Sequence, residues 1–430
     1  MKIKYYFLFI LLILQGNLMS ATIKHIDIKG VQIPVIFEEQ KALPILNLQL
    51  VFQNSGYIQD KNKSGLVNLS SKLLNEGTKE LGATKFAEKL EENAISLATS
   101  NGFETFVIEL SNLKEQSKKG IELLTALLKS PNYSQDTLNK LKTMQIGSLK
   151  RKENDFDYVS NNQLKSILFK GTSLENPASG TIESISNIEL KDIENFITQT
   201  VCLENLIIVA GGDYELKEFE KLVKPFLETL NVGKKVELEK VNFTSKKEET
   251  ILIKDTQQAY IYFGSSFNID SKDEENYKAK VASFILGGSG FGSRLMEEIR
   301  VKRGLAYSAY GSISINKSHS YFNGYLQTKN ETSDEAKKLV GEIIEDFVKN
   351  GVTQDELSAA KNFLTGSEPL RNETLSQRLS RAFTLYYRGL EPDYSKKELE
   401  KIQTLELTDL NNYIKSHSEI NNLTFSIVRK

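Results

Sequence analysis

Residues 185–206 read ISNIELKDIENFITQTVCLENL, and residues 402–423 read IQTLELTDLNNYIKSHSEINNL. At a constant offset of 217 residues, eight of the 22 aligned positions are identical. Upstream, LFKG at 168–171 matches YYRG at 386–389 at an offset of 218, so the offset drifts by a single residue, as a small gap between copies would produce. Solenoid repeats have much shorter periods of about 20–50 residues. We therefore predict a duplication into two homologous halves, residues 22–231 and 232–430.

The composition is that of a folded globular protein. Of 430 residues, 40% are hydrophobic and 26% are charged, which excludes wholesale disorder. A formal net charge of −1 gives no electrostatic reason to expect nucleic acid as a partner. The single cysteine, Cys202, excludes an intramolecular disulfide and a zinc site built on cysteines. His25, His319 and His417 lie in separate segments without ligand spacing, and we expect them at the surface or at helix caps.

Each half shows the same order of expected elements, with strands early and helices late. Alternating β-rich stretches predict strands, and apolar residues spaced by three and four predict helices. Asp334 and Thr353 are expected at helix N-caps. This order predicts an α+β fold in which each half has a mostly antiparallel sheet covered by helices. The expected strands are 45–52, 103–110, 205–210, 259–263, 321–328 and 422–428, and the expected helices are 117–128, 134–152, 190–200, 334–348, 353–365 and 407–416.

The two ends of the first half have distinct compositions. Residues 1–21 have the layout of a secretory signal peptide, because Lys2 and Lys4 precede a short apolar run and small residues follow it. The run is short for a transmembrane span, although an uncleaved membrane anchor is the alternative. We expect cleavage, export and no stable membrane insertion. Residues 233–247 are rich in Lys and Glu and predict an exposed linker.

One string in the second half resembles a known family. Residues 286–307 read LGGSGFGSRLMEEIRVKRGLAY. Together with the duplicated α+β halves, this string resembles the insulinase/pitrilysin family of metallopeptidases, and more closely its short bacterial and mitochondrial-processing-peptidase-like branch. The resemblance implies a clamshell in which two halves face each other. In the family, one half carries zinc and the other closes over an extended peptide.

The zinc motif of that family, His-x-x-Glu-His, is absent from this sequence. Flanking glycines fix the register, and by resemblance Asn68 and Lys72 then stand at the two histidine positions and Ser71 at the position of the general base. The distal glutamate ligand falls near Gln145 or Ile146. A lysine ammonium repels a zinc ion, so the resemblance implies a non-catalytic chain that holds no metal or other cofactor of its own.

Arg300 and Tyr307, seven residues apart, are the candidate catalytic pair. In the family an arginine and a tyrosine at this spacing lie opposite the zinc, and the resemblance implies that they bind the substrate carbonyl and stabilise the oxyanion. A guanidinium is always charged and a phenol is a neutral donor, which suits this role. The alternative is that Arg294, Arg300 and Arg303 form a solvated helix face and that Tyr307 is an ordinary strand aromatic.

Two further segments are assigned to substrate binding by resemblance. The edge strand that includes Ser96, Leu97 and Ala98 is expected to pair with the backbone of an extended peptide, and an edge strand without a ligand is the alternative. A glycine-rich loop is expected to help admit substrate, and its spacing does not match the G-x-G-x-x-G pattern of nucleotide sites. Its glycines are Gly287, Gly288, Gly290 and Gly292.

These features predict a zinc-free, substrate-binding subunit of an exported, periplasmic heterodimeric metallopeptidase. A homologous partner chain would supply His-x-x-Glu-His and zinc, while this chain would supply Arg300 and Tyr307 to an extended peptide substrate. The alternative is a non-enzymatic peptide-binding or assembly protein built on an inactivated peptidase fold, comparable to the core subunits of respiratory complexes that resemble this family.

Overall fold

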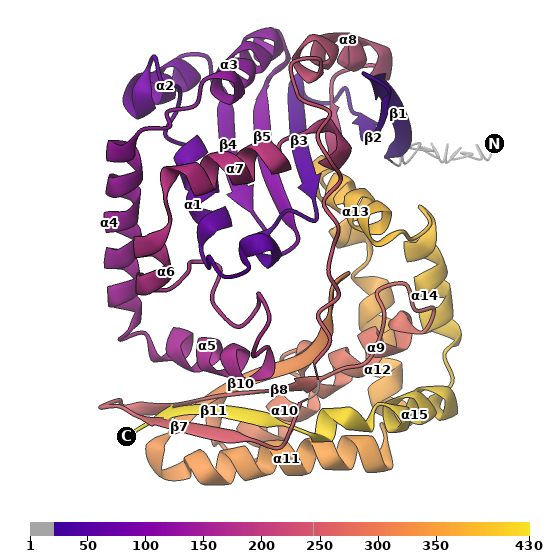
Figure 1. The fold of residues 1–430 in the computed structure, drawn as a ribbon. Coiled ribbons are helices and arrows are strands. Elements are labelled where there is room, and N and C mark those ends of the chain that lie inside the picture. The colour runs from indigo at the N-terminus through magenta and orange to yellow at the C-terminus, as the bar shows by residue number, and fades with distance from the viewer. Residues whose placement is uncertain (1–20, 244) are drawn as a thin grey trace, which may run out of the picture.

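Two mixed sheets, each with its own helices, form a two-half α+β fold, as the duplication predicts, and its clamshell-like shape agrees with the resemblance (Figure 1). The computed structural model describes residues 21–243 and 245–430. Among the paired strands, β2 with β6 and β7 with β11 are parallel, and the other neighbours are antiparallel. The first sheet has the order β1 (Thr22–Ile28), β2 (Val31–Glu39), β6 (Leu206–Gly212), β3 (Ile45–Gln53), β5 (Thr105–Leu113) and β4 (Ser96–Asn101). The second has the order β7 (Glu249–Ile253), β11 (Thr424–Arg429), β8 (Gln258–Ser266), β10 (Ser320–Lys329) and β9 (Ala306–Ile315).

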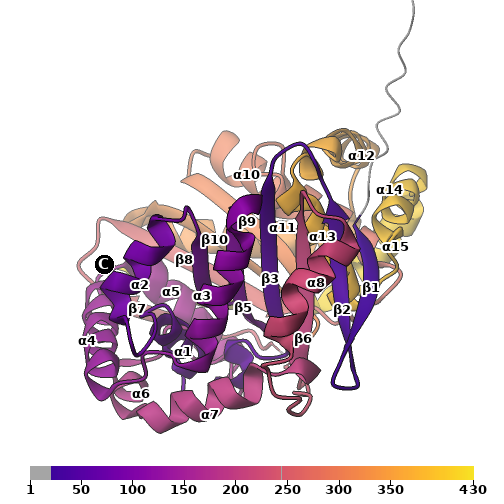
Figure 2. The same cartoon turned by 90° about the horizontal axis from the view of Figure 1, so that it is seen from above.

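The expected helices and strands are confirmed to within a few residues at each end. The helices of the first half are α1 (Leu66–Leu74), α2 (Gly82–Glu91), α3 (Ser117–Lys129), α4 (Gln135–Lys152), α5 (Phe156–Leu168), α6 (Ile182–Asn187), α7 (Leu190–Thr200) and α8 (Leu216–Leu227). Those of the second are α9 (Asn276–Ser283), α10 (Arg294–Met296), α11 (Ser333–Asn350), α12 (Gln354–Gly366), α13 (Leu375–Arg388), α14 (Tyr394–Thr404) and α15 (Leu407–Ser416). Figure 2 shows α3 and α8 on the face of the first sheet that is turned away from the second half.

The two expected N-caps differ in outcome. Thr353 forms a capping box with Glu356 at the start of α12, as predicted. The assignment of Asp334 is wrong, because α11 already begins at Ser333. Asp334 lies in the first turn, where a negative charge interacts favourably with the helix dipole. Its carboxylate accepts a hydrogen bond from Arg429 at 2.9 Å.

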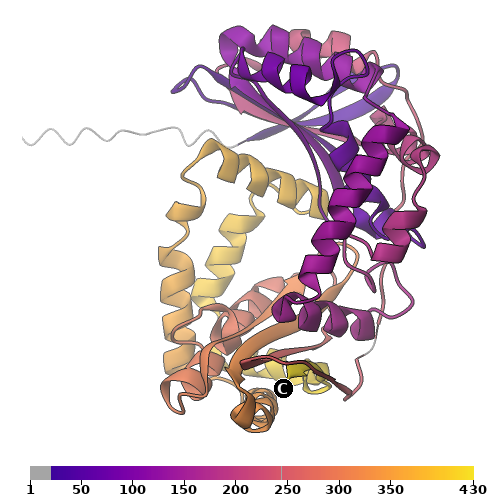
Figure 3. The same cartoon turned by 90° about the vertical axis from the view of Figure 1, so that its left-hand side faces the viewer.

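The two halves exchange equivalent helices. Figure 3 shows α5 of the first half lying on the second sheet and α13 of the second half lying against the first sheet. Leu375 and Leu379 of α13 pack against Ile36, Val51 and Val209 of the first sheet. The duplicated helix therefore covers the sheet of the other half, and each sheet needs both halves to bury its apolar side chains.

Polar contacts fix this exchange. Arg378 on α13 pairs with Glu38 of β2 at 2.7 Å, and Glu38 is only 3% exposed. On α5, the Ser160 hydroxyl donates to the Ser426 carbonyl of β11 at 2.8 Å. Arg378 can contact Glu38 only when α13 lies on the first sheet, so the pair is specific to the closed arrangement of the two halves. Burial raises the pKa of Glu38, which offsets part of the attraction.

The segment between the halves is exposed along most of its length, as expected, but it is not a free linker. Asn54 donates to the Val236 carbonyl at 2.8 Å, and the Val236 amide donates to Asn205 at 2.8 Å. Val241 is buried beside α5. The Val241 amide also donates to the Ser318 carbonyl of the second half at 2.9 Å. The connection is thus attached to both halves, which limits their relative movement.

The signal-peptide prediction falls on residues 1–21, of which 1–20 lie outside the described residues. In the described part of the chain, no helix has the length and apolar character needed to cross a membrane.

The expectation for the histidines is confirmed for two of them and wrong for His319. His25 is exposed on β1, and His417 is the C-cap of α15. His319 instead lies where the halves meet, with its ring 4.8 Å from that of Phe103 and 5.3 Å from that of Phe169. Burial lowers the pKa of His319 to about 4, and the neighbouring Lys165 ammonium adds to the effect.

Protonation of His319 should weaken the folded state at acidic pH. Between about pH 6.5, the usual histidine pKa, and pH 4, the unfolded chain binds a proton that the folded chain does not bind. Stability should therefore decrease as pH falls through this window, by up to about 3 kcal/mol from His319 alone. Denaturant unfolding of His319→Phe and wild type at pH 7, 5.5 and 4 should show a smaller pH-dependent loss in the variant. The exposed control His25→Gln should follow the wild type; parallel pH profiles for all three proteins would contradict this role.

Candidate functional site

Helix α1 positions the residues that replace the zinc motif. It begins after Gly65, whose φ of +90° is unfavourable for other residues. The Asp60 carboxylate accepts hydrogen bonds from the amides of Gly65 at 2.8 Å and Val67 at 2.9 Å, which satisfies free donors of the first turn. Burial raises the pKa of Asp60 to about 7. The start and direction of α1 are therefore firmly set.

The positions assigned to the metal ligands do lie together. Lys72 on α1 donates a hydrogen bond to the Gln145 side chain on α4, the position assigned to the distal glutamate. Gln145 is 6% exposed, and its amide donates to the Ser179 carbonyl at 2.9 Å. Burial, together with the neighbouring Lys152 charge, lowers the pKa of Lys72. An ammonium and a neutral amide thus face each other at positions that the resemblance assigns to zinc ligands.

The remaining positions of the motif are held by neutral side chains. Asn68 and Ser71 both donate to the Asn101 side chain at the end of β4, at 3.3 and 3.2 Å. A zinc site needs imidazole, thiolate or carboxylate donors, and the set of Asn68, Ser71, Lys72 and Gln145 does not fit that requirement. Within the described residues, no group of three or more His, Cys, Asp or Glu side chains could hold a metal ion. Sequence reasoning missed Asn101, because no local pattern links the end of β4 to α1.

The predicted substrate-binding strand is the edge strand β4, but not all of its edge is open. In the register with β5, Ser96 pairs with Ser111 and Ala98 with Glu109. Thr99 faces the opposite way, because its amide donates to the Asn75 side chain at 2.7 Å and its carbonyl accepts from the same side chain at 2.9 Å. Backbone groups alternate in direction along a strand, so Leu97 shares the outward direction of Thr99. Of the three predicted residues, Leu97 is the one whose backbone can pair with a peptide.

Arg300 and Tyr307 lie side by side in the second half. Arg300 is on the π-helical turn Glu297–Val301, and its guanidinium carbon lies 4.5 Å from the ring centre of Tyr307 and 4.7 Å from that of Phe291. Tyr307 is 80% exposed and Phe291 67% exposed. Stacking of a guanidinium between two rings orients it without using its hydrogen-bond donors. Sequence reasoning missed Phe291, although it is the one aromatic residue in the glycine-rich loop.

Of the three arginines, Arg294 does not lie on a solvated face, because its side chain is 15% exposed. The Arg294 guanidinium donates to Glu356 at 2.5 and 2.8 Å and joins α10 to α12. Arg303 pairs with Glu298 at 2.6 Å. In the described residues, the Arg300 and Tyr307 side chains form no hydrogen bond with the rest of the chain, so their donors can reach a ligand.

The expected glycine-rich loop is wrong for two of its glycines, because Gly287 and Gly288 end the π-helical turn Phe284–Gly288. Gly287 is buried, and a Cβ there would lie 2.4 Å from the Gly311 amide nitrogen of β9, so its small size serves packing. Gly290 and Gly292 have φ values of +68° and +89°, and Gly288 is exposed. Gly288, Gly290 and Gly292 form the outward-facing part of this segment, which lies next to Phe291 in the sequence and precedes Arg300.

Comparison with known proteins places this geometry in a family. The family model described as the peptidase M16 inactive domain matches residues 187–364. The non-peptidase homolog YmxG of Helicobacter pylori is 44% identical over 412 residues, which cover 96% of this chain and 95% of that protein. The chain belongs to the peptidase M16 family. An uncharacterised zinc protease, YmxG of Bacillus subtilis, is 22% identical over 320 residues, 74% of this chain and 77% of the relative.

Several solved structures share this fold. The peptidase M16 inactive domain from Pseudomonas fluorescens superposes with a TM-score of 0.87 at 23% identity, covering 95% of this chain and 98% of that one. A chain of complex III2 from Candida albicans gives 0.76 at 17% identity, with coverages of 95% and 96%. The periplasmic protease PqqL from Escherichia coli gives 0.75 at 13% identity, and the match covers 94% of this chain but 47% of PqqL. The M16 comparisons confirm the resemblance inferred from the sequence.

If the register of the degenerate site is right, four substitutions should restore metal binding. The variant Asn68→His/Ser71→Glu/Lys72→His/Gln145→Glu places two imidazoles four residues apart on α1 and a carboxylate where Gln145 contacts Lys72. We expect about one zinc ion per chain by elemental analysis after dialysis against zinc. A control with Thr143→Glu in place of Gln145→Glu should bind zinc more weakly, because Thr143 is bonded within α4. A folded four-site variant that takes up no zinc would show that the register is wrong.

The side chain of Asn75 should contribute measurably to stability. Asn75→Leu leaves the outward amide and carbonyl of Thr99 without a side-chain partner in a residue that is 5% exposed. Because an unsatisfied buried polar group costs about 1–3 kcal/mol, the free energy of unfolding should fall by roughly that amount for each of the two groups. The control Asn93→Leu removes one bond to the Lys89 carbonyl at an exposed site and should change it by less than about 0.5 kcal/mol. Equal stabilities of the two variants in urea unfolding would refute the assignment.

Proposed function

We propose that this chain is the zinc-free, substrate-binding subunit of a heterodimeric metallopeptidase. A homologous partner with His-x-x-Glu-His would supply the zinc, and this chain would supply Arg300 and Tyr307. The observation that carries the proposal is an asymmetry. Lys72 and Gln145 stand at the positions that the resemblance assigns to metal ligands in one half. In the other half Tyr307 is exposed, Arg300 is half-buried against its ring, and neither side chain donates a hydrogen bond within the described residues.

The proposed chemistry of the pair is electrostatic. The zinc of the partner polarises the scissile carbonyl and activates water when it is bound. The guanidinium of Arg300 and the hydroxyl of Tyr307 donate hydrogen bonds to the carbonyl oxygen as negative charge develops on it. Phe291 limits the freedom of the guanidinium by stacking on it, so less rotational entropy is lost when the carbonyl binds.

Peptide binding is proposed to use the remaining open edge of β4 and the outward part of the glycine-rich loop. Leu97 offers an outward amide and carbonyl for strand addition. Gly288, Gly290 and Gly292 allow the loop to change shape as a peptide enters, because glycine has the widest backbone freedom. These assignments apply to an extended peptide, since strand pairing requires extended backbone.

Export to the periplasm and pairing with a second chain are part of the same proposal. The apolar run after Lys2 and Lys4 supports a signal peptide. PqqL is a periplasmic protease of about twice this length, and this chain matches 47% of it. This chain has about half the length of PqqL and lacks the metal-binding residues of the family motif, which is compatible with a peptidase assembled from two separate chains. The proposed boundary between the two halves of this chain lies between residues 231 and 232.

A second candidate is a non-enzymatic peptide-binding or assembly protein. Two comparisons favour it: the name of the Helicobacter pylori relative is non-peptidase homolog, and a chain of complex III2 shares the fold. Under this alternative no partner chain gains peptidase activity from this protein, and the Arg300 and Tyr307 donors have no catalytic role.

Removal of either donor should reduce catalysis by the mixed subunits. With a zinc-bearing homologue from the same organism, Arg300→Ala and Tyr307→Phe should lower kcat by about 10²–10³-fold, since each removes a donor to the developing oxyanion. The control Arg303→Ala changes a nearby exposed pair with Glu298 and should keep full activity. Size-exclusion chromatography checks that each variant still assembles. Unchanged kcat for both donor variants in an assembled complex would reject the mechanism.

A further inference from the structure

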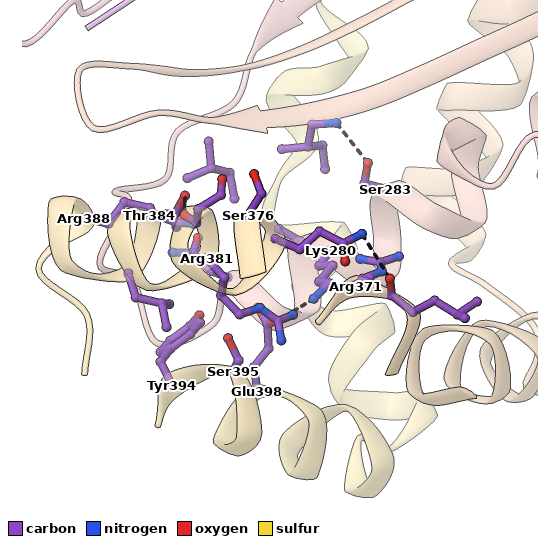
Figure 4. A pocket seen from close by; sticks show the side chains of 18 of the residues that line it. Lys280, Ser283, Arg371, Ser376, Arg381, Thr384, Arg388, Tyr394, Ser395 and Glu398 are labelled. Atoms are coloured by element: carbon purple, nitrogen blue, oxygen red, sulfur yellow. Dashed lines mark hydrogen bonds and ion pairs between the residues drawn. The ribbon is translucent and has the colours of Figure 1, made fainter. Parts of the chain in front are cut away.

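A pocket of about 850 Å³ lies in the second half between α9, α13 and α14 (Figure 4). Helix α13 has two chemically different faces. Leu375 and Leu379 pack on the first sheet, whereas Ser376, Ser380 and Thr384, spaced by four residues, line the pocket. A helix brings residues at this spacing onto one side. One wall of the pocket, which we call the α13 pocket, is thus a row of hydroxyl groups.

The charges of the α13 pocket are predominantly positive. Glu398 is the only carboxylate among the lining side chains, and Lys280 pairs with it at 2.5 Å. The full chain has a formal net charge of −1, so this excess is local. Figure 4 shows the basic groups entering from α9, from the turn before α13 and from α13 itself. They are Lys280, Arg371, Arg381 and Arg388.

Two of these guanidiniums are not neutralised within the described residues. Arg381 pairs with Glu368, but Arg371 is exposed and its side chain forms neither an ion pair nor a hydrogen bond there. Arg388 donates to the Ser271 carbonyl at 2.7 Å, and its buried Nε has no partner. Burial raises the pKa of Tyr394, another lining residue, to about 12, so its phenol remains a neutral donor.

The α13 pocket adjoins the proposed peptide site. Ser376 also lines a smaller cavity of about 190 Å³ on the first sheet, together with Ser96 and Ala98 of β4. The two cavities therefore share Ser376, and Glu109 of β5 adds a carboxylate to the lining of the smaller one.

We propose that the α13 pocket binds carboxylates of the peptide substrate and selects peptides with an acidic segment beside the strand that pairs with β4. The inference rests on the proposed function and names its substrate class. A guanidinium fork matches a carboxylate in geometry and charge, and the hydroxyl row of α13 supplies neutral donors for its second oxygen. A basic segment would meet like charges here and be rejected, so the pocket discriminates by repulsion as well as by attraction.

The test is peptide binding to the full chain without a partner. Three fluorescein-labelled 12-residue peptides alternate Ala with Glu, Gln or Lys, and fluorescence anisotropy gives Kd at 50 mM NaCl. We expect the Glu peptide to bind at least about tenfold more tightly than the Gln peptide, and the Lys peptide to bind most weakly. Arg371→Gln should weaken the Glu peptide by about fivefold or more. Lys396→Gln, which removes one charge from an exposed position of α14 outside the pocket lining, should change Kd by less than about twofold. Circular dichroism checks that both variants are folded.

Each outcome of this experiment supports or overturns the proposal. Equal affinities for the Glu and Gln peptides, or equal losses for Arg371→Gln and Lys396→Gln, would overturn it. Inorganic tripolyphosphate that binds more tightly than the Glu peptide and displaces it would overturn the assignment to peptide carboxylates. The two proposals have separate readouts: peptide affinity tests the α13 pocket, and turnover by the mixed subunits tests the Arg300–Tyr307 pair. Glu-selective binding beside an inactive subunit mixture would therefore reject the proposed catalytic role alone, and an active mixture without Glu selectivity would reject the α13 pocket alone.

Discussion

The reciprocal exchange of α5 and α13 is the constraint on which the rest of the structure depends. Each helix is the duplicate of the other, and each covers the sheet of the opposite half (Figure 3). Burial of an aliphatic side chain such as Leu375 or Leu379 contributes about 1.5–3 kcal/mol. Separation of the halves would lose this apolar burial and the Arg378–Glu38 pair, although the cost of burying Glu38 offsets part of the attraction within the pair. The exchange therefore fixes the position of α13 and, with it, one wall of the α13 pocket.

Side-chain hydrogen bonds explain how the degenerate site remains ordered without a metal. In a zinc site, the metal holds its ligands together. Here Lys72 and Gln145 bond to each other, and Asn101 receives hydrogen bonds from Asn68 and Ser71. Polar side chains satisfy one another across α1, α4 and β4, so the helices keep their spacing. The replacement is a different solution to packing and not an empty space.

Much of the fold could be predicted from the sequence, because duplication and periodicity are properties of the chain itself. The strand and helix ranges agree, and Thr353 caps α12 as its pattern indicates. Contacts between distant segments could not be predicted in this way. His319 has the polar sequence context of a surface turn, and only packing against Phe103 and Phe169 shows it to be enclosed. In the same way, the bond from Asn75 to Thr99 depends on how α1 lies along β4. The local sequence does not indicate that Asn75 and Thr99 lie next to each other in the fold.

The central claim is that this chain holds no zinc and completes the site of a zinc-bearing homologue. The most direct test is to co-express the two chains, isolate the complex and measure its zinc content and peptidase activity beside those of each chain alone. We expect one zinc ion per heterodimer, no zinc bound by this chain alone, and peptidase activity only in the heterodimer. A stoichiometric zinc ion in the isolated chain, or full activity of the partner without it, would contradict the account.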